Sequence, residues 1–484
     1  MPKDRASLLI RHGLILTMDD QRNIIANGSI AIRDSLIVGL GSDAELAEKY
    51  EAPQEIDASQ QVVLPGFVNA HTHAIHILLR GGLSQDRNLY DWLLNVLYPG
   101  VIAYTGDDAR IAATLYCVEA IRSGITTTVD NADWGMIDVL AENTIESYKS
   151  CGIRAVYARM FSDCEPKGAE ALTQAILSRE PNVKHAENYV EETDKALRSI
   201  ECLMKRYHDT ADGRISVWPS PGIPLFLTAE GMKGALALAE KYDTMLTTHL
   251  AESPADATSF GVSTTQYLAY IGFLSKRLLA GHCVWMSDKD LQLLKLFEVK
   301  VAHNAVSNQY LGSGIAPITK MVNNGIVVGI GTDDANCNDS VNILSDMKHV
   351  ALLQKVHNLD AAAITAEKVL EMATIDGAKA IGMDQKIGSI ERGKKADIIT
   401  IDMKQPHLKP CHHVPAVLVY QANGSEVDTT IVDGKVLMHK RKLKLLSDQG
   451  EEELLNSAQK ASEDIIVRAG MQDIKNRGWQ RYSI

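Results

Sequence analysis

The sequence lacks the signatures of membrane, nucleic-acid-binding and disulfide-rich proteins. No apolar run approaches the ~18 residues of a membrane-spanning helix. The net charge is −12 and the densest basic cluster, residues 439–442, is short, which excludes nucleic acid as a partner. The seven cysteines are scattered, odd in number and never in a CxxC pair, as in reduced cytoplasmic proteins. Because charged residues interrupt residues 11–20, no signal peptide is predicted, and we expect a cytoplasmic protein.

What the sequence does contain is enough apolar residues for a large core, since 45% of its 484 residues are hydrophobic. Residues 1–66 have short β-rich runs separated by Asp, Asn and Gly, which predict a small antiparallel sheet. The same pattern of short β-rich runs recurs in residues 385–445, with runs at 387–403, 416–421 and 427–438. Residues 446–484 predict a helical tail. We therefore expect one β-sandwich, assembled from both ends of the chain.

Residues 67–384 alternate between helix-sized intervals and short apolar strands, which is typical of βα units. One predicted helix, Asp107 to Arg122, has a single apolar stripe and stops before Gly124. Eight strand candidates close a TIM-like barrel. The predicted fold class is α/β, a (β/α)8 barrel inserted in the β-sandwich. The candidates are VVLPGFVNAHTH, GITTTVDNAD, IRAVYARMF, RISVWPSPG, TMLTTHLAES, RLLAGHCV, VKVAHNAVSN and IVVGIGTDD.

The first of these strands ends in His71-Thr72-His73. Side chains alternate along a strand, so both imidazoles point to one face, about 7 Å apart, and can share a metal ion. One such pair is weak support in a chain with 15 histidines. Several other barrel strands, however, also end in metal-competent or polar residues, at the edge where such barrels hold their active sites. These are Asp130, Asn131, His249, Glu252, His282, His303, Asp333 and Asp334.

Together these residues predict a mononuclear site with an open position for water. A divalent ion there lowers the pKa of its water toward ~7. We expect Zn²⁺, with Fe²⁺ as the alternative. Glu252 is placed to shuttle protons, His282 to orient the water, and Asp333 to accept the first proton. The predicted ligands are His71, His73, His249 and Asp333.

Many segments between about residue 7 and residue 445 resemble sequence motifs of the amidohydrolase superfamily. Within it, the sequence resembles the s-triazine hydrolases, the group of melamine deaminase and atrazine chlorohydrolase. The resemblance implies the same metal ligands, Glu252 and His282 as catalytic residues, and a homo-oligomer. The segments that carry it are LPGFVNAHTH, LLRGG, SGITT, HLAES, AHNAVSN, GIGTDD and GSIERGKKADI.

Two positions distinguish the deaminase from the chlorohydrolase in that group. After the metal aspartate, the chlorohydrolase has Asn and then Ser, whereas the deaminase has Asp and then Cys. This sequence has Asp334 and Cys337. An amino group must be protonated before it leaves as ammonia, and a carboxylate at position 334 can hydrogen-bond it or pass it a proton. Cys337 is read as a substrate contact or as a small buried filler.

Further residues are predicted to contact the substrate. The segment 90–93 falls where an aromatic wall would stack on a flat ring, or is the ordinary core of a short helix. His76 stands where the triazine enzymes are expected to have Gln, and His303 matches general heterocycle deaminases better. The predicted contacts are His76, Tyr90, Trp92, Leu93, Asn131, His303, Asp334 and Cys337.

The sequence thus predicts a metal-dependent deaminase that releases ammonia from a nitrogen-rich ring, with melamine-like triazines first. Guanine- or isocytosine-type rings and biguanide or guanidine compounds are alternatives. A chlorotriazine dehalogenase is a rival, against which Asp334 and Cys337 count. A non-catalytic scaffold is a second rival, but the full ligand set is present. The expected partners are a small-molecule substrate and water, with no nucleic acid and no membrane.

Overall fold

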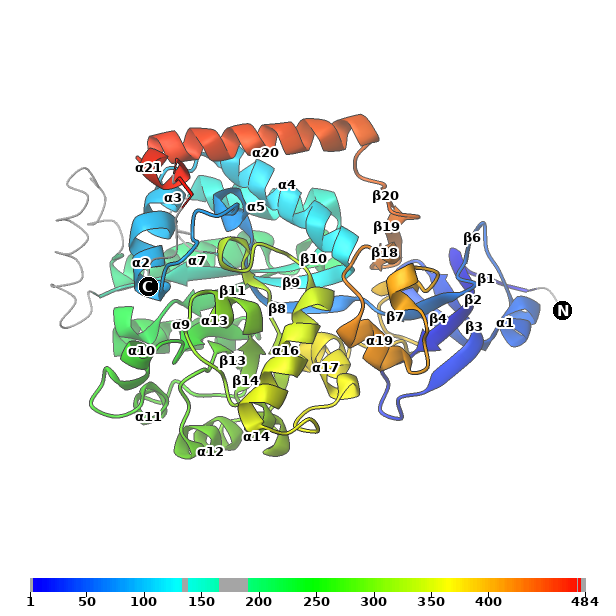
Figure 1. Cartoon of the computed structure of the whole chain (residues 1–484), viewed down its shortest axis with the longest axis horizontal. Helices are drawn as coiled ribbons and strands as arrows, with labels where there is room; N and C mark the ends of the chain where they lie inside the picture. The colour runs from blue at the N-terminus through cyan, green and yellow to red at the C-terminus, as the bar shows by residue number, and fades with distance from the viewer. Residues whose placement is uncertain (1–2, 133–137, 165–189, 477, 480–484) are drawn as a thin grey trace.

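A computed structural model describes residues 3–132, 138–164, 190–476 and 478–479. The predicted ranges 67–384 and 446–484 include some residues outside these. The centre of the molecule is a barrel of parallel strands (Figure 1). One sheet has the order β11-β10-β9-β8-β16 and the other β12-β13-β14-β15. The strands are β8 (Phe67–His73), β9 (Ile125–Ala132), β10 (Arg154–Phe161), β11 (Ile215–Pro221), β12 (Leu246–Leu250), β13 (Leu278–His282), β14 (Lys300–His303), β15 (Val328–Ile330) and β16 (Asp333–Asp334).

The two barrel sheets join into one closed wall. The His249 N–H donates to the Gly222 carbonyl oxygen at 2.9 Å, which bridges the β11 and β12 edges. On the other side, β15 runs on into β16, which pairs with β8. All predicted barrel strands are present at the expected places, because buried runs of β-branched residues between turn residues define strands well. The predicted α/β barrel fold is confirmed.

Strands from both ends of the chain form the β-sandwich beside the barrel (Figure 1). Its sheet has the order β20-β19-β18-β17-β7-β2-β3-β4, with β6 also on β2. It is mixed rather than antiparallel, since β2 pairs in parallel with both β6 and β7. Its strands are β2 (Leu8–Leu16), β3 (Ile24–Arg33), β4 (Leu36–Ser42), β6 (Gln54–Asp57), β7 (Gln61–Pro65), β17 (Ile398–Asp402), β18 (Val427–Val432), β19 (Lys435–His439) and β20 (Lys442–Leu443); β1 (Asp4–Arg5) and β5 (Tyr50–Glu51) pair separately.

One predicted strand is wrong. Residues 416–421 were expected in the sandwich sheet, but Val414–Tyr420 is the helix α19. Pro415 occupies its first turn, where a proline costs no hydrogen bond. Val417, Leu418 and Val419 are buried where α19 packs against α16 and α17. Tertiary packing therefore overrides the β propensity of this segment.

Helices surround the barrel; α4 confirms the helix predicted at 107–122, and α20 lies within the predicted helical tail (Figure 1). None of the helices in the described residues is long and apolar enough to cross a membrane. The longer helices are α1 (Asp43–Lys49), α4 (Gly106–Ser123), α5 (Asp138–Cys151), α7 (Thr193–Tyr207), α9 (Ala229–Lys241), α11 (Thr264–Tyr270), α12 (Asp288–Leu296), α16 (Ile343–Asn358), α17 (Ala366–Ala373), α19 and α20 (Asp448–Arg468). The short ones include η1 (Ala74–Leu79), α2 (Leu89–Trp92), the π-helix η2 (Leu93–Leu97), α3 (Tyr98–Ile102), α8 (Thr210–Gly213), η4 (Pro224–Phe226), α10 (Pro254–Thr258), α13 (Ala305–Tyr310), α14 (Ile318–Asn323), α15 (Ala335–Asn338), α18 (Ile375–Ala380), η5 (Pro406–Leu408) and α21 (Gln472–Lys475).

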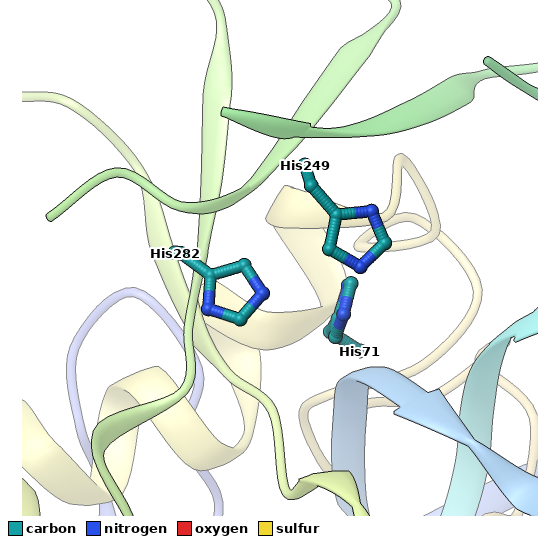
Figure 2. Close-up of side chains that lie close together, drawn as sticks. All are labelled: His71, His249 and His282. Atoms are coloured by element: carbon teal, nitrogen blue, oxygen red, sulfur yellow. The ribbon is translucent and has the colours of Figure 1, made fainter. Parts of the chain in front are cut away.

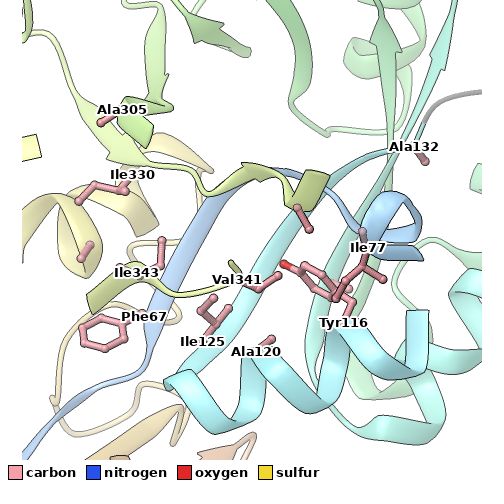
Figure 3. Close-up of a cluster of buried hydrophobic side chains, with 14 of the residues drawn as sticks. Phe67, Ile77, Tyr116, Ala120, Ile125, Ala132, Ala305, Ile330, Val341 and Ile343 are labelled. Atoms are coloured by element: carbon pink, nitrogen blue, oxygen red, sulfur yellow. The ribbon is translucent and has the colours of Figure 1, made fainter. Parts of the chain in front are cut away.

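Apolar packing between the barrel wall and α4 fixes the position of β8 in the barrel. Phe67, Tyr116 and Ile125 are buried together there (Figure 3). The Tyr116 hydroxyl lies 3.0 Å from Asn69 Nδ2 and 2.6 Å from Thr128 Oγ1, so the one polar atom of this contact is satisfied. Truncating a buried aromatic side chain to alanine lowers the free energy of unfolding by about 3–5 kcal/mol. This packing holds the strand that ends in His71 and His73.

A buried ion cluster joins the start of β10 to the sandwich. Arg154 donates to both carboxylate oxygens of Asp397, at 2.8 and 3.1 Å, and lies 3.5 Å from Asp433. Lys395 is 2.9 Å from Asp433. Burial alone would lower the pKa of Arg154, but the two carboxylates raise it. We call Arg154, Lys395, Asp397 and Asp433 the anchor cluster.

Candidate metal centre

Four histidines and two carboxylates converge at the carboxyl ends of the barrel strands. His71 and His73 come from β8, His249 from β12 and His282 from β13; Figure 2 shows His71, His249 and His282 turned toward one another. Two sets have ligand atoms close enough to hold an ion: one is His71, His249 and His282, and the other is His71, His73 and Asp333. We call the full group the metal centre; its members are His71, His73, His249, Glu252, His282 and Asp333.

The ring nitrogens in this group face one another at short range. His249 Nε2 is 3.3 Å from His73 Nε2, and Asp333 Oδ1 is 3.3 Å from His71 Nε2 and 3.5 Å from His73 Nε2. All of these side chains are almost completely buried. Neutral imidazoles and a carboxylate packed this way present several lone pairs to one point, as zinc ligands do.

The outer nitrogens of two rings are fixed by amides. The amide of Asn131 lies 2.9 Å from His71 Nδ1, and His282 Nδ1–H donates to Asn308 Oδ1 at 3.0 Å. Such a bond at Nδ1 orients the ring and leaves Nε2 for the interior. His71 Nε2 is buried without a hydrogen-bond partner among the described residues, an arrangement that a divalent ion would complete. The residues present therefore fit a metal ion.

Burial and neighbouring charges set the protonation of the centre. Burial lowers the pKa of His71 to about 4 and that of His249 well below its usual value. Burial alone would raise the pKa of Asp333, but the neighbouring histidines hold it well below its usual range. The two imidazoles are thus neutral and Asp333 is ionised at neutral pH, which are the forms that bind a metal.

Glu252 is a member of the metal centre that belongs to neither ligand set. Its Oε2 is 3.5 Å from His282 Nε2, and the backbone N–H groups of Glu252 and Ser253 donate to Asp256 at 3.0 and 2.7 Å. Burial raises the pKa of the Glu252 carboxyl from 4.5 to about 7. A carboxyl group in that range gives up and takes back a proton readily at neutral pH.

The backbone turns sharply where two of these residues are presented. His282 has φ 67° and Asp333 has φ 60°, both in the left-handed region that non-glycine residues rarely adopt. Strain of this kind costs of order 1–3 kcal/mol per residue and collects at functional sites. The turn aims both side chains at the ring nitrogens of the neighbouring strands.

The centre opens into a hollow with a mainly apolar wall and a volume of about 50 Å³. Trp92 and Leu93 lie in this wall, as the sequence predicts, and so does Cys337. Burial raises the pKa of the Cys337 thiol well above its usual value, so it is neutral. The lining residues are His73, Leu89, Trp92, Leu93, Leu97, Tyr98, Met160, Ile223, His249, Glu252, His282, Leu311, Asp333 and Cys337.

The other predicted substrate contacts are not among the residues that line the hollow. The Tyr90 hydroxyl is 3.2 Å from Ser253 Oγ, and Asn131 bonds to His71. Asp334 Oδ2 is 2.5 Å from His76 Nδ1. His303 is fully buried, and burial lowers its pKa to about 3. None of these five residues belongs to the lining, and their predicted contact with substrate stays a prediction.

Sequence reasoning missed two kinds of residue. Asn308 orients His282, and the motif AHNAVSN that contains it gave a usable signal. The rest of the apolar wall was missed, because Met160, Ile223 and Leu311 cannot be told from ordinary core residues in the sequence. The residue type of a leucine or methionine does not indicate whether its side chain faces the core or a substrate pocket.

Comparison with known proteins shows which family the chain is similar to. The model of the amidohydrolase family matches residues 62–437. An S-triazine hydrolase of Gordonia rubripertincta is 35% identical over 479 residues, 98% of each chain. A 5′-deoxyadenosine deaminase of Methanosarcina barkeri is 34% identical and covers 96% of this chain and 99% of its own. The crystal structure of an adenosine deaminase from Xanthomonas campestris with bound zinc has a TM-score of 0.85 at 25% identity, covering 96% of this chain and 100% of its own.

The predicted superfamily and the resemblance to s-triazine hydrolases are thereby confirmed. The family model spans most of the chain, including the strands that carry the metal centre. Its buried histidine and aspartate side chains are those of a metal site. The chain belongs to the amidohydrolase family, as a metal-dependent hydrolase that acts on carbon–nitrogen bonds.

Proposed function

We propose that this protein removes an amino group, as ammonia, from a small flat nitrogen-rich ring, with amino-triazines of the melamine type as the leading substrate class. The observation that carries this proposal is the wall around the metal centre. Apart from the centre itself, its lining is almost entirely apolar, with Leu89, Trp92 and Leu93 on one side. A flat ring stacks on such a wall and makes its polar contacts only with the centre.

The residues of the chain have separate tasks in this reaction. We assign His71, His73, His249 and Asp333 to the metal, with zinc favoured by the zinc-bound adenosine deaminase structure. A divalent ion in such a site supplies an activated water at neutral pH. His282, held by Asn308, orients that water, and Asp333 accepts its proton. Glu252 then carries the proton to a ring nitrogen of the substrate.

The proton on Glu252 matters because the ring carbon becomes a better electrophile when the neighbouring nitrogen is protonated. The carbon–oxygen bond forms, and the remaining proton of the new hydroxyl passes, through Asp333, to the amino group. The carbon–nitrogen bond then breaks, the ring carbonyl forms, and the amine departs as neutral ammonia. The apolar wall keeps bulk water from the reacting groups, which strengthens each charge interaction in the site. The homo-oligomer implied by the resemblance belongs to the same proposal.

A 5′-deoxyadenosine-type nucleoside is the second candidate, favoured by relatives with that activity at 34% identity. A ribose brings hydroxyl groups that need hydrogen-bond partners when buried. Among the described lining residues outside the metal centre, the side chains with polar atoms are Tyr98, Cys337 and Trp92, and the Trp92 indole N–H already donates to Asn336. We therefore rank the free ring above the nucleoside.

The test is product release from a matched set of substrates, with protein of known metal content. Melamine, guanine, isocytosine, a biguanide and 5′-deoxyadenosine are assayed for ammonia, and a chlorotriazine for chloride. Ammonia from melamine with the highest kcat/KM supports the proposal. A preference for 5′-deoxyadenosine by tenfold or more overturns it in favour of the nucleoside, and faster chloride release overturns the assignment as a deaminase.

A further inference from the structure

A buried carboxylate–imidazole pair lies directly behind the metal centre. His76 Nδ1 is 2.5 Å from Asp334 Oδ2, and neither residue is exposed. Asp334 follows Asp333 on β16, and His76 lies in η1, three residues after His73. Neither residue lines the hollow. The geometry therefore directs this pair toward the protein and away from the substrate.

One end of the pair rests on His73. The rings of His76 and His73 are stacked, with centroids 5.3 Å apart and planes 6° from parallel. The pairing of β16 with β8 also sets Asp334 opposite His73 in the barrel wall. An imidazole held by a carboxylate on one side and stacked on its neighbour on the other limits how far the His73 ring can turn.

The other end of the pair reaches the wall of the hollow. Asp334 Oδ1 accepts from the backbone N–H of Asn336 at 3.0 Å. Asn336 Oδ1 in turn accepts from the indole Nε1–H of Trp92 at 3.0 Å. Both oxygens of the Asp334 carboxylate are thus engaged, one toward the metal centre and one toward the wall.

We propose that Asp334 and His76 are a positioning pair, which fixes the His73 ring for the metal and, through Asn336, holds Trp92 in the wall against which the substrate lies. Asp334 then gives no proton to the leaving amine, in contrast to the role predicted from the sequence. The proposal rests on the proposed metal-dependent function, but it does not depend on which ring is the substrate. Substitution of a side chain that supports a metal-bound histidine usually lowers the metal affinity 10- to 100-fold.

The test uses Asp334→Asn, His76→Leu, His76→Gln and the double variant Asp334→Asn/His76→Leu. Metal affinity is measured by competition with a chromophoric chelator, and ligand geometry by the visible spectrum of the Co²⁺ form. We expect Asp334→Asn and His76→Leu to weaken metal binding about 10- to 100-fold and to alter the Co²⁺ spectrum. His76→Gln, whose amide still donates to Asp334, should retain most of the affinity. The double variant should be no weaker than the worse single variant, because both act in one unit.

Trp92→Phe is the matched control, since it removes the bond to Asn336 and leaves the His76 contact in place. It should raise KM and leave metal affinity and the Co²⁺ spectrum unchanged. The proposal is overturned if Asp334→Asn keeps both metal readouts at wild-type values while kcat for ammonia release falls. If Asp334→Asn does not fold, the two His76 variants decide by the same criteria. A failure of the proposed function would appear as absent ammonia release in the wild type and would leave the metal readouts intact.

Discussion

The molecule buries charge in two places, and the two places are completed differently. In the anchor cluster, Arg154 and Lys395 supply the cations for Asp397 and Asp433. In the metal centre, Asp333 and Glu252 have no lysine or arginine among their described contacts. Their neighbours are histidines, two of which burial holds neutral.

This difference separates a structural cluster from a functional one. Buried charges are costly unless they are paired, and the anchor cluster is paired from within the chain. The metal centre has carboxylates and lone pairs aimed at one point, and its carboxylates have only histidines as cationic contacts among the described residues. A missing partner at the end of a barrel strand is therefore the feature that identifies the reactive site.

Removal of the metal should have the largest effect. Dialysis against a strong chelator should reduce ammonia release to background, because no side chain in the centre can supply an activated water. The free energy of unfolding should also fall, by about 4 kcal/mol relative to protein in metal at roughly 1,000-fold above Kd. Assays and thermal melts before and after metal is restored give both values. Metal-free protein with the wild-type rate would show that the centre needs no external cation.

Glu252→Gln should leave the metal in place and remove the proton carrier. We expect kcat to fall about 10²- to 10⁴-fold, the usual contribution of a general acid or base. Metal content by mass spectrometry should be unchanged, since Glu252 belongs to neither ligand set. Glu230→Gln, at an exposed position, is the matched control and should keep the wild-type rate. A loss of metal in Glu252→Gln would instead make Glu252 a ligand.

Arg154→Met should break the other cluster. It leaves Asp397 and Asp433 buried without their main cation, which costs about 3–5 kcal/mol of unfolding free energy. The rate per folded, metal-loaded molecule should stay at the wild-type value. Urea denaturation and active-site titration measure the two quantities. The control Arg206→Met removes a surface pair with Glu142 and should cost far less unfolding free energy, because solvent screens that pair. Equal losses in the two variants would contradict the structural role of the anchor cluster.

The Arg11–Asp43 pair should have the smallest effect, at most about 2 kcal/mol, because the Arg11 side chain is partly exposed and solvent screens the pair. The hydrogen bond from Arg11 lowers the pKa of the Asp43 carboxyl from 3.8 to about 2. A depressed carboxyl pKa stabilises the fold above pH ~4, and that stabilisation disappears as the pH falls toward about 2. The difference in unfolding free energy between wild type and Asp43→Asn should shrink over that window. A difference that grows on acidification would contradict the assignment.

Much of the fold could be predicted from the sequence, because the ends of barrel strands are marked by polar and turn residues that follow short apolar runs. The buried run before His71-Thr72-His73, and those before His249 and His282, stop at polar residues, and the strands end there. The segment 416–421 failed because its valines suit a strand as well as a packed helix. Only the contact with α16 and α17 decides between the two.

The direction of each side chain could not be predicted. The sequence places Asp334 and Asn131 at strand ends, yet the first bonds to His76 and the second to His71. These partners come from β8 and η1, far away in the chain. The left-handed backbone at His282 and Asp333 also changes where their side chains point, and nothing in their residue types announces it.

The closure of the barrel has a consequence for how the protein acquires its metal. β16 pairs with β8, where Thr72 Oγ1 donates to the Asp333 carbonyl oxygen across 261 positions of chain. During synthesis, His71 and His73 emerge long before Asp333, and they meet it only after the intervening strands have assembled. Bringing such distant segments together is slow and depends on topology more than on local preference. Stable metal uptake is therefore a late event, and the loaded ion reports a barrel that has closed in the correct register.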